Sequence, residues 1–188
     1  MIGEYIARRQ LVSTDDGYDH RLHHVAHAEL SEDTTQTAGM RRREAISGKS
    51  VGSSAIWMGE TIVPPATGSG NHHHGESETG IYVVSGNPEF VFLEGDRETR
   101  LKSSPGDFVF VPPWVPHREE NPDPEVEAVV VIARSTQEAI VVNLDDLVWV
   151  GPVAVGRAED QPTWHEYERG RLSNQQVEQP QADAGGIA

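Results

Sequence analysis

Residues 71–78 read NHHHGESE, and residues 106–117 read GDFVFVPPWVPH. Side chains two positions apart project from the same face of an extended backbone, so His72 and His74 would point the same way. The second stretch is an apolar run that ends in prolines and is closed by one more histidine, His117. Three imidazoles that converge across a barrel interior suit Fe, Mn, Ni, Cu, Co or Zn and leave positions open for substrate or water. The two stretches together predict a metal site.

Short extended segments surround these two stretches. They are rich in Val, Ile, Phe and Tyr, are separated by Gly, Pro and Asn/Asp turns, and often follow one another at a spacing of roughly ten residues. The predicted strands are 43–47, 55–63, 79–85, 89–93, 98–102, 108–111, 126–133 and 139–144. No alternation with long helices is visible. The pattern is typical of an all-β sandwich or barrel.

The composition limits the class of protein. The 188 residues, 36% of them apolar, suffice for one packed domain with solvated ends. The formal net charge of -15 repels phosphate backbones and anionic lipid, so we expect neither nucleic acid nor a membrane as a partner. The chain has no cysteine, so any metal must be held by nitrogen and oxygen donors.

We divide the chain into three parts. Residues 1–39 are predicted to form a partly disordered N-terminal extension, residues 40–148 the barrel, and residues 149–188 a C-terminal extension that is largely disordered toward its end. The chain does not open with a basic segment followed by an apolar run. No stretch approaches the roughly eighteen apolar residues of a membrane span, so we expect a cytoplasmic protein.

The N-terminal extension holds a second group of histidines, namely His20, His23, His24 and His27. These imidazoles would share one face if the stretch were helical, and such a face can bind a metal. A solvated segment without a site is the simpler interpretation of the same pattern.

The two histidine stretches resemble the two motifs of the cupin superfamily. The second motif, G-x5-P-x-G-x2-H-x3-N, is matched by Gly106, Pro112, His117 and Asn121. Trp114 stands in place of its inner glycine. The first motif, G-x5-H-x-H-x3,4-E-x6-G, is matched by His72, His74, Glu78 and Gly86. Ala66 replaces its leading glycine, and seven residues rather than six separate Glu78 from Gly86. The resemblance covers roughly residues 40–145 and implies a double-stranded β-helix, or jelly-roll, cupin barrel with one divalent transition metal.

The resemblance also implies that Glu78 joins the three histidines as a fourth metal ligand. Counted back from Gly86, however, the position of the family's carboxylate falls on Thr79. In a regular strand Glu78 would then point away from the metal, unless a bulge, which Gly80 would permit, restores its direction. We favour a site of three histidines and Glu78. A three-histidine site, with Glu78 on the surface or beside the ligands, or with Glu76 reaching in, stays open.

Other side chains are candidates for contact with a substrate. Glu76 or Tyr82 would serve as a general acid or base if either faces the pocket. Tyr82 belongs to an aromatic alternation that more often marks core packing than a cavity lining. The three arginines at 41–43 can bind a carboxylate or phosphate, and they are equally typical of solvated charge. Trp114 either narrows the entrance of the pocket or packs on a neighbouring subunit.

The resemblance implies a metal-dependent protein that acts on a small molecule. Many three-histidine cupins resemble dioxygenases, so an iron-dependent dioxygenase-type oxidoreductase is the first expectation. A Lewis-acid isomerase, cyclase or lyase is the alternative, and a non-catalytic small-molecule sensor is a third. Iron is the expected metal, with Zn, Mn, Ni, Co and Cu as alternatives. Open strand edges lead us to expect a homodimer.

Overall fold

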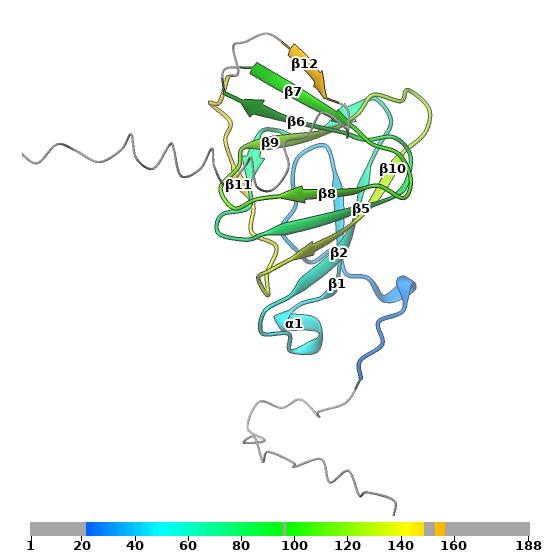
Figure 1. The fold of residues 1–188 in the computed structure, drawn as a ribbon. Coiled ribbons are helices and arrows are strands. Elements are labelled where there is room, and N and C mark those ends of the chain that lie inside the picture. The colour runs from blue at the N-terminus through cyan, green and yellow to red at the C-terminus, as the bar shows by residue number, and fades with distance from the viewer. Residues whose placement is uncertain (1–21, 96, 149–152, 157–188) are drawn as a thin grey trace, which may run out of the picture.

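The computed structural model describes residues 22–95, 97–148 and 153–156. This part of the chain is almost entirely β-structure (Figure 1). Its helical segments are the 3-10 turn η1 (His27–Glu29) and the short helix α1 (Gly48–Val51). The strands are β1 (Arg41–Ile46), β2 (Trp57–Val63), β3 (Thr67–Gly68), β4 (His72–His73), β5 (Thr79–Ser85), β6 (Glu89–Glu94), β7 (Arg97–Lys102), β8 (Phe108–Val111), β9 (His117–Asn121), β10 (Ala128–Arg134), β11 (Val142–Asn143) and β12 (Val153–Gly156).

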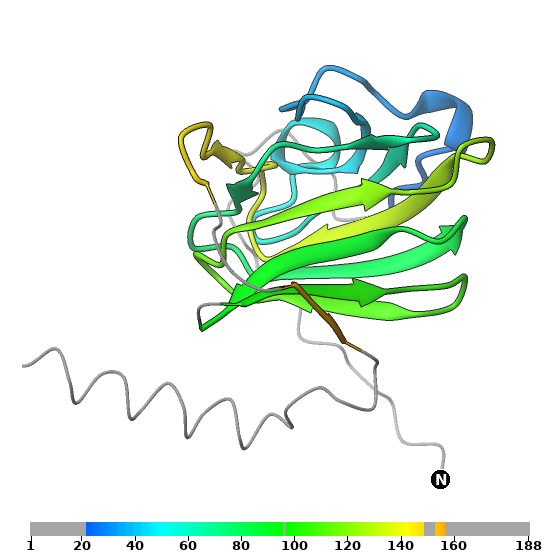
Figure 2. The ribbon, with the colours of Figure 1, turned by 90° about the horizontal axis from the view of Figure 1, so that it is seen from above.

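The strands form two sheets that face each other across one core (Figures 1 and 2). One sheet has the order β1-β2-β10-β5-β8. The other has the order β11-β4-β9-β6-β7-β12, with β3 also paired to β9. All pairings are antiparallel except that between β12 and β7. Strands distant in sequence lie side by side, and the all-β jelly-roll barrel predicted from the sequence is confirmed.

The predicted strands agree best with the structure where Val, Ile, Phe and Tyr are concentrated. The strands predicted at 79–85 and 108–111 coincide with β5 and β8, and the one predicted at 139–144 is reduced to β11. Strand β9 was not predicted, because its sequence, HREEN, has no apolar residue. Strand β12 begins beyond the predicted barrel limit at residue 148 and pairs with β7.

Side-chain alternation gives each strand an inner and an outer face. The apolar core consists of Trp57, Ile81, Val83, Phe90, Val111, Val130, Ile132 and Ala139. On β9 the buried side chains are all polar, namely His117, Glu119 and Asn121. Asn121 donates from Nδ2 to the carbonyls of Val63 and Val126, at 3.1 and 2.8 Å, and so ties β9 to the strands around it. The barrel interior is therefore apolar over much of its surface and polar along β9.

Two residues that replace motif glycines keep the backbone conformation that favours glycine. Ala66 has φ 49° and Trp114 has φ 64°, both in the left-handed region. The chain thus retains the two turns of the family pattern at a cost in backbone strain. Gly86 keeps its glycine, with φ 74°, and an added Cβ there would lie 2.7 Å from the Ala128 Cα.

Residues 22–40 lead into the barrel and are fastened to it by the backbone bridge between Ser31 and Glu44. The predictions made for residues 1–21 and 157–188, including disorder at both ends, lie outside the described residues. Within the described ranges, no helix is long and apolar enough to span a membrane.

Candidate metal centre

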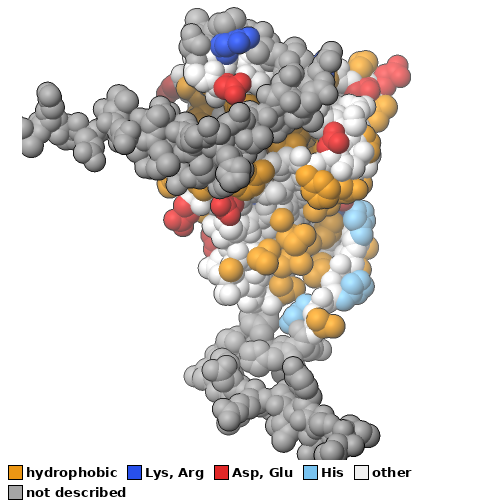
Figure 3. Space-filling model, viewed as in Figure 1, with side chains coloured by type: hydrophobic (Ala, Val, Ile, Leu, Met, Phe, Trp, Pro, Cys, Tyr) orange, Lys and Arg blue, Asp and Glu red, His pale blue; other side chains and the backbone are white. Residues whose placement is uncertain are grey.

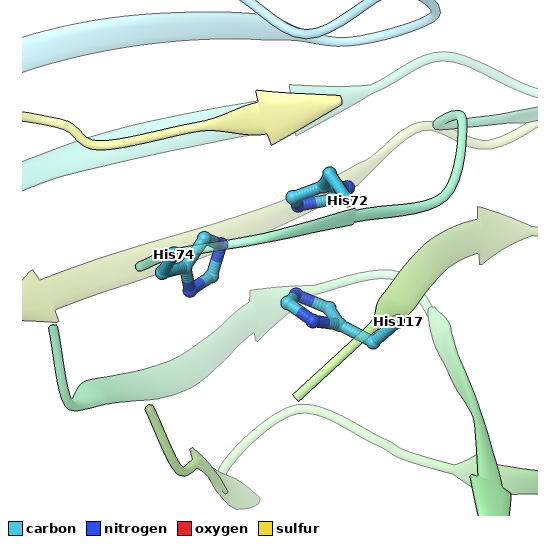
Figure 4. Close-up of side chains that lie close together, drawn as sticks. All are labelled: His72, His74 and His117. Carbon is cyan, nitrogen blue, oxygen red and sulfur yellow. The ribbon is translucent and has the colours of Figure 1, made fainter. Parts of the chain in front are cut away.

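Three buried histidines converge in the barrel interior (Figure 4). His72 and His74 come from β4 and the turn after it, and His117 begins β9, where it is paired in register with His72. The candidate ligand atoms of the three imidazoles lie within 4.8 Å of one another. The extended backbone at 72–74 puts two of the rings on one face, as the sequence predicted, and strand pairing supplies the third.

The hydrogen bonds of the three rings leave the same nitrogen free in each. His72 Nδ1 lies 3.0 Å from the Gly70 carbonyl, and His117 Nδ1 lies 2.9 Å from the Val115 carbonyl. His74 Nδ1 lies 2.8 Å from Thr79 Oγ1. The three Nε2 atoms are buried without a hydrogen-bond partner. A carbonyl oxygen can only accept, so Nδ1 of His72 and of His117 carries the proton. In a neutral ring Nε2 is then unprotonated, and its lone pair is free to bind a metal.

The environment keeps these imidazoles neutral. Burial lowers the pKa of His72 to about 3, and repulsion between its protonated ring and that of His117 contributes to the shift. Burial also lowers the pKa of His117 to about 4, and burial and the Arg134 guanidinium lower the pKa of His74. Neutral rings whose lone pairs converge fit a divalent transition metal, because no proton competes for the site at neutral pH. The arrangement can hold such an ion with three nitrogen ligands.

The structure does not bring Glu78 to the histidines. Its side chain is exposed, while the next residue, Thr79, is fully buried and reaches His74. Strand β5 pairs without interruption with β8 from Thr79 to Tyr82, so no bulge at Gly80 turns Glu78 inward. Because side chains alternate along a strand, the position that the family fills with a carboxylate holds Thr79 here. The structure thus places Thr79, and not Glu78, in contact with the histidines, where it hydrogen-bonds the candidate ligand His74.

The two side chains expected to act as acid or base also lie away from the histidines. Glu76 is exposed. Tyr82 points outward from β5, because Ile81 and Val83 take the inner face, and its ring contacts Phe108 with centroids 4.9 Å apart. His73 turns away from its two neighbours, accepts from the Gly75 N–H, and lies beside Trp114.

The N-terminal histidines do not form a second centre in the structure. His20 lies outside the described residues, and among those described the only cluster suited to a metal is His72, His74 and His117. His27 lies in a surface network, with Nε2 3.2 Å from Glu60 Oε2 and 2.9 Å from an Arg43 nitrogen.

Three charged residues of the interior were not singled out by the sequence. Arg42, Glu119 and Arg134 are 1%, 1% and 2% exposed. A signal for two of them was present: Arg134 continues the inward alternation of Ala128, Val130 and Ile132, and Glu119 stands two residues after His117. Arg42 was noted only as part of the run at 41–43. The strand alternation of β1 separates it from its exposed neighbour Arg41.

Comparison with known proteins agrees with the fold and the histidine motif. Residues 59–133 match the family model described as a cupin domain. The matched stretch includes all three histidines. These residues therefore form a cupin domain, and the resemblance seen in the sequence is confirmed. A search of curated proteins found no match.

Solved structures with the same fold have low sequence identity to this chain. The polyketide cyclase RemF from Streptomyces resistomycificus is 20% identical, with a TM-score of 0.54 over 66% of this chain and 86% of its own. Oxalate decarboxylase from Bacillus subtilis is 20% identical, with a TM-score of 0.52 over 60% of this chain. Only 29% of that enzyme is covered. A recombinant oxalate oxidase in complex with glycolate is 16% identical, with a TM-score of 0.50 over 60% of this chain and 61% of its own.

Substitutions at 78 and 79 test which residue supports the metal. Thr79→Val removes the hydrogen bond to His74 Nδ1, so we expect metal affinity to fall by about 10- to 100-fold, as for other groups that orient a ligand. Glu78→Gln should leave affinity unchanged, because the carboxylate is exposed. Competition titration against a chromophoric chelator measures both. A loss of affinity in Glu78→Gln that matches or exceeds the loss in Thr79→Val would restore Glu78 as a ligand.

Proposed function

We propose that this chain is a metal-dependent cupin enzyme that acts on a small molecule, with dioxygenation by an iron-loaded centre as its reaction. The observation that carries the proposal is the convergence of three buried, unpartnered Nε2 atoms. A divalent metal held there would supply a Lewis-acidic centre with positions left open for substrate and, in the iron form, for dioxygen. Iron is the proposed metal; the similar oxalate decarboxylase from Bacillus subtilis has Mn(II) centres, so manganese is also to be tested.

The chain's own groups prepare the centre before any ligand arrives. The carbonyls of Gly70 and Val115 hold His72 and His117 in one tautomer and orientation. Thr79 orients His74 from the neighbouring strand. All three imidazoles are buried, which limits access of bulk water and strengthens the electrostatic interactions of the site. None of the three ligands is charged, so the centre retains its full positive charge and favours a substrate that binds as an anion.

Lewis-acid chemistry without oxidation is the second candidate function. It is favoured by the likeness to RemF, which is a polyketide cyclase. The two reactions differ in what the metal must do, because cyclisation or isomerisation requires only polarisation of an oxygen, whereas oxygenation requires a redox-active ion. A sensor that binds a small molecule without converting it is the non-catalytic alternative.

Metal exchange separates these candidates. We expect the Fe(II)-loaded chain to consume oxygen with at least one member of a panel of phenolics, diketones and thiols, measured with an oxygen electrode and mass spectrometry of the product. The Zn(II)-loaded chain is the matched control, because zinc has no redox chemistry. Equal product formation with zinc and without oxygen would establish the Lewis-acid reaction instead. Binding of a panel member with no conversion by either form would favour the sensor.

We also propose that the chain forms a homodimer, and the outer face of β5 and β8 supports this. Hydrophobic side chains gather over these strands (Figure 3). Four of them define what we call the β5–β8 face: Tyr82, Val84, Phe108 and Phe110. Phe108 is 80% exposed, and β8 is an edge strand whose free side offers unpaired backbone groups.

A charge on this face is expected to prevent association. Phe108→Glu should convert a dimer to a monomer in sedimentation at micromolar concentration, since a carboxylate in an apolar interface would be buried without a partner. Val126→Glu, at an exposed apolar residue outside these two strands, is the control and should remain dimeric. A wild-type chain that sediments as a monomer would refute the homodimer, and a dimeric Phe108→Glu variant would move the interface elsewhere.

A further inference from the structure

The guanidinium of Arg134 presents an unused hydrogen-bonding edge inside the barrel. One of its nitrogens, Nη1, donates to the Ile140 carbonyl at 2.8 Å, and its Cζ atom lies 5.6 Å from the centre of the Trp57 ring. The other two nitrogens, Nε and Nη2, are buried and have no hydrogen-bond partner. These two N–H groups point the same way and form the fork that binds both oxygens of a carboxylate.

This edge lies in the neighbourhood of the three histidines. Arg134 on β10 is paired in register with Thr79 on β5, and Thr79 holds His74. The Arg134 charge also contributes to lowering the pKa of His72, His74 and His117 alike. An anion seated on the fork would therefore lie beside the candidate metal centre.

Within the described residues, neither of the two buried arginines has a carboxylate within ion-pair distance. Arg42 and Arg134 are two buried cations, and Glu119 is the one carboxyl group that interacts electrostatically with both. Within the described residues, no oxygen of Glu119 lies within ion-pair distance of either guanidinium, and its Oε2 has no partner. Arg42 is engaged with the Thr35 carbonyl and Thr37 Oγ1. A buried charge costs free energy unless it is paired, and a divalent metal near Arg134 would add further positive charge.

We propose that Arg134 forms a carboxylate-binding subsite next to the three-histidine centre, so that the substrate is a small carboxylic acid in its anionic form. The carboxylate accepts from Nε and Nη2 of Arg134, and Arg42 on β1 adds positive potential. The subsite deepens the proposed function, because it names the class of substrate. Carboxylate binding itself needs only this chain's residues.

The test uses the full chain stripped of metal, so that it stands apart from oxygen or metal chemistry. Malonate and benzoate are titrated by calorimetry, with malonamide and benzamide as neutral controls of the same shape and sulfate and phosphate as other anions. We expect the carboxylates to bind and the amides not to bind. Arg134→Lys should weaken carboxylate binding by at least about tenfold, because an ammonium keeps the charge but lacks the fork. Arg134→Gln should abolish it. Arg100→Lys, in a half-exposed cluster with Glu89 and Glu120, is the control and should bind as the wild type does.

A second readout on the wild-type chain covers the case in which a variant at 134 fails to fold. In protein labelled with 15N at arginine Nε, one buried resonance should shift on addition of malonate and stay in place with malonamide. Unchanged carboxylate affinity in a folded Arg134→Gln variant would overturn the subsite, as would a wild-type chain that shows neither calorimetric binding nor a shifted resonance. Tighter binding of sulfate or phosphate than of either carboxylate would overturn the substrate class. A chain that consumes oxygen yet binds no carboxylate refutes this inference alone.

Discussion

His117→Ala is expected to reduce metal content from stoichiometric to background. The three Nε2 atoms converge from two separate segments of the chain, and His117 is the only contribution from β9. Without it, two ligands from one short segment remain, and such a pair cannot compete with buffer for a divalent ion. Elemental analysis after loading and gel filtration measures the effect, with melting temperature as the check that the variant is folded.

The neighbouring histidine provides a matched control. His73→Ala removes an imidazole one residue from two of the ligands, but that ring points away and lies beside Trp114. We expect His73→Ala to keep full metal content. Full occupancy in a folded His117→Ala chain would refute the three-histidine assignment, and loss of metal in His73→Ala would show that the ring assignments are exchanged.

Trp57→Ala is expected to lower the free energy of unfolding by about 3–5 kcal/mol, because it removes the largest fully buried side chain of the core. The indole is 0% exposed and packs in the cluster that includes Ile81 and Ile132. Its Nε1–H donates to Glu44 Oε2 at 3.1 Å. Urea unfolding measures the loss as a lower midpoint at an unchanged slope.

Trp57→Phe separates the packing from the hydrogen bond. Phenylalanine keeps an aromatic ring but leaves Glu44 Oε2 without the Trp57 donor, while Oε1 still accepts from Ser47 Oγ. We therefore expect a smaller loss of about 1–3 kcal/mol. A loss in Trp57→Phe equal to that in Trp57→Ala would show that the hydrogen bond, and not the ring, dominates. A loss below about 1 kcal/mol in Trp57→Ala would contradict the place of Trp57 in the core.

Sequence patterns predicted the strands that are rich in Val, Ile, Phe and Tyr. Strands β5 and β8 were predicted residue for residue, since one face of each meets the core. Strand β9 was missed because its inner face is polar, with His117, Glu119 and Asn121 buried. Strand prediction from apolar residues fails for β9 because its buried side chains are polar.

The three candidate histidine ligands could be predicted from the sequence. The spacing of His72 and His74 is a local property of an extended backbone, and the resemblance of the second stretch to the cupin motif supplied His117. The choice between Glu78 and Thr79 was not local. It depended on the register of β5 against β8 and β10, which decides which of two adjacent side chains faces inward.

The sequence by itself determined the all-β class, the strands with apolar faces and the three histidines, because these depend on spacing along one segment. Only the tertiary structure decided that Thr79 replaces the expected carboxylate, that Tyr82 faces outward, and that the free edge of Arg134 lies in the interior beside the histidines. The physical reason is that a polar side chain is buried only where neighbouring strands or the facing sheet supply groups that contact it. The spacing of residues along one segment does not identify those groups.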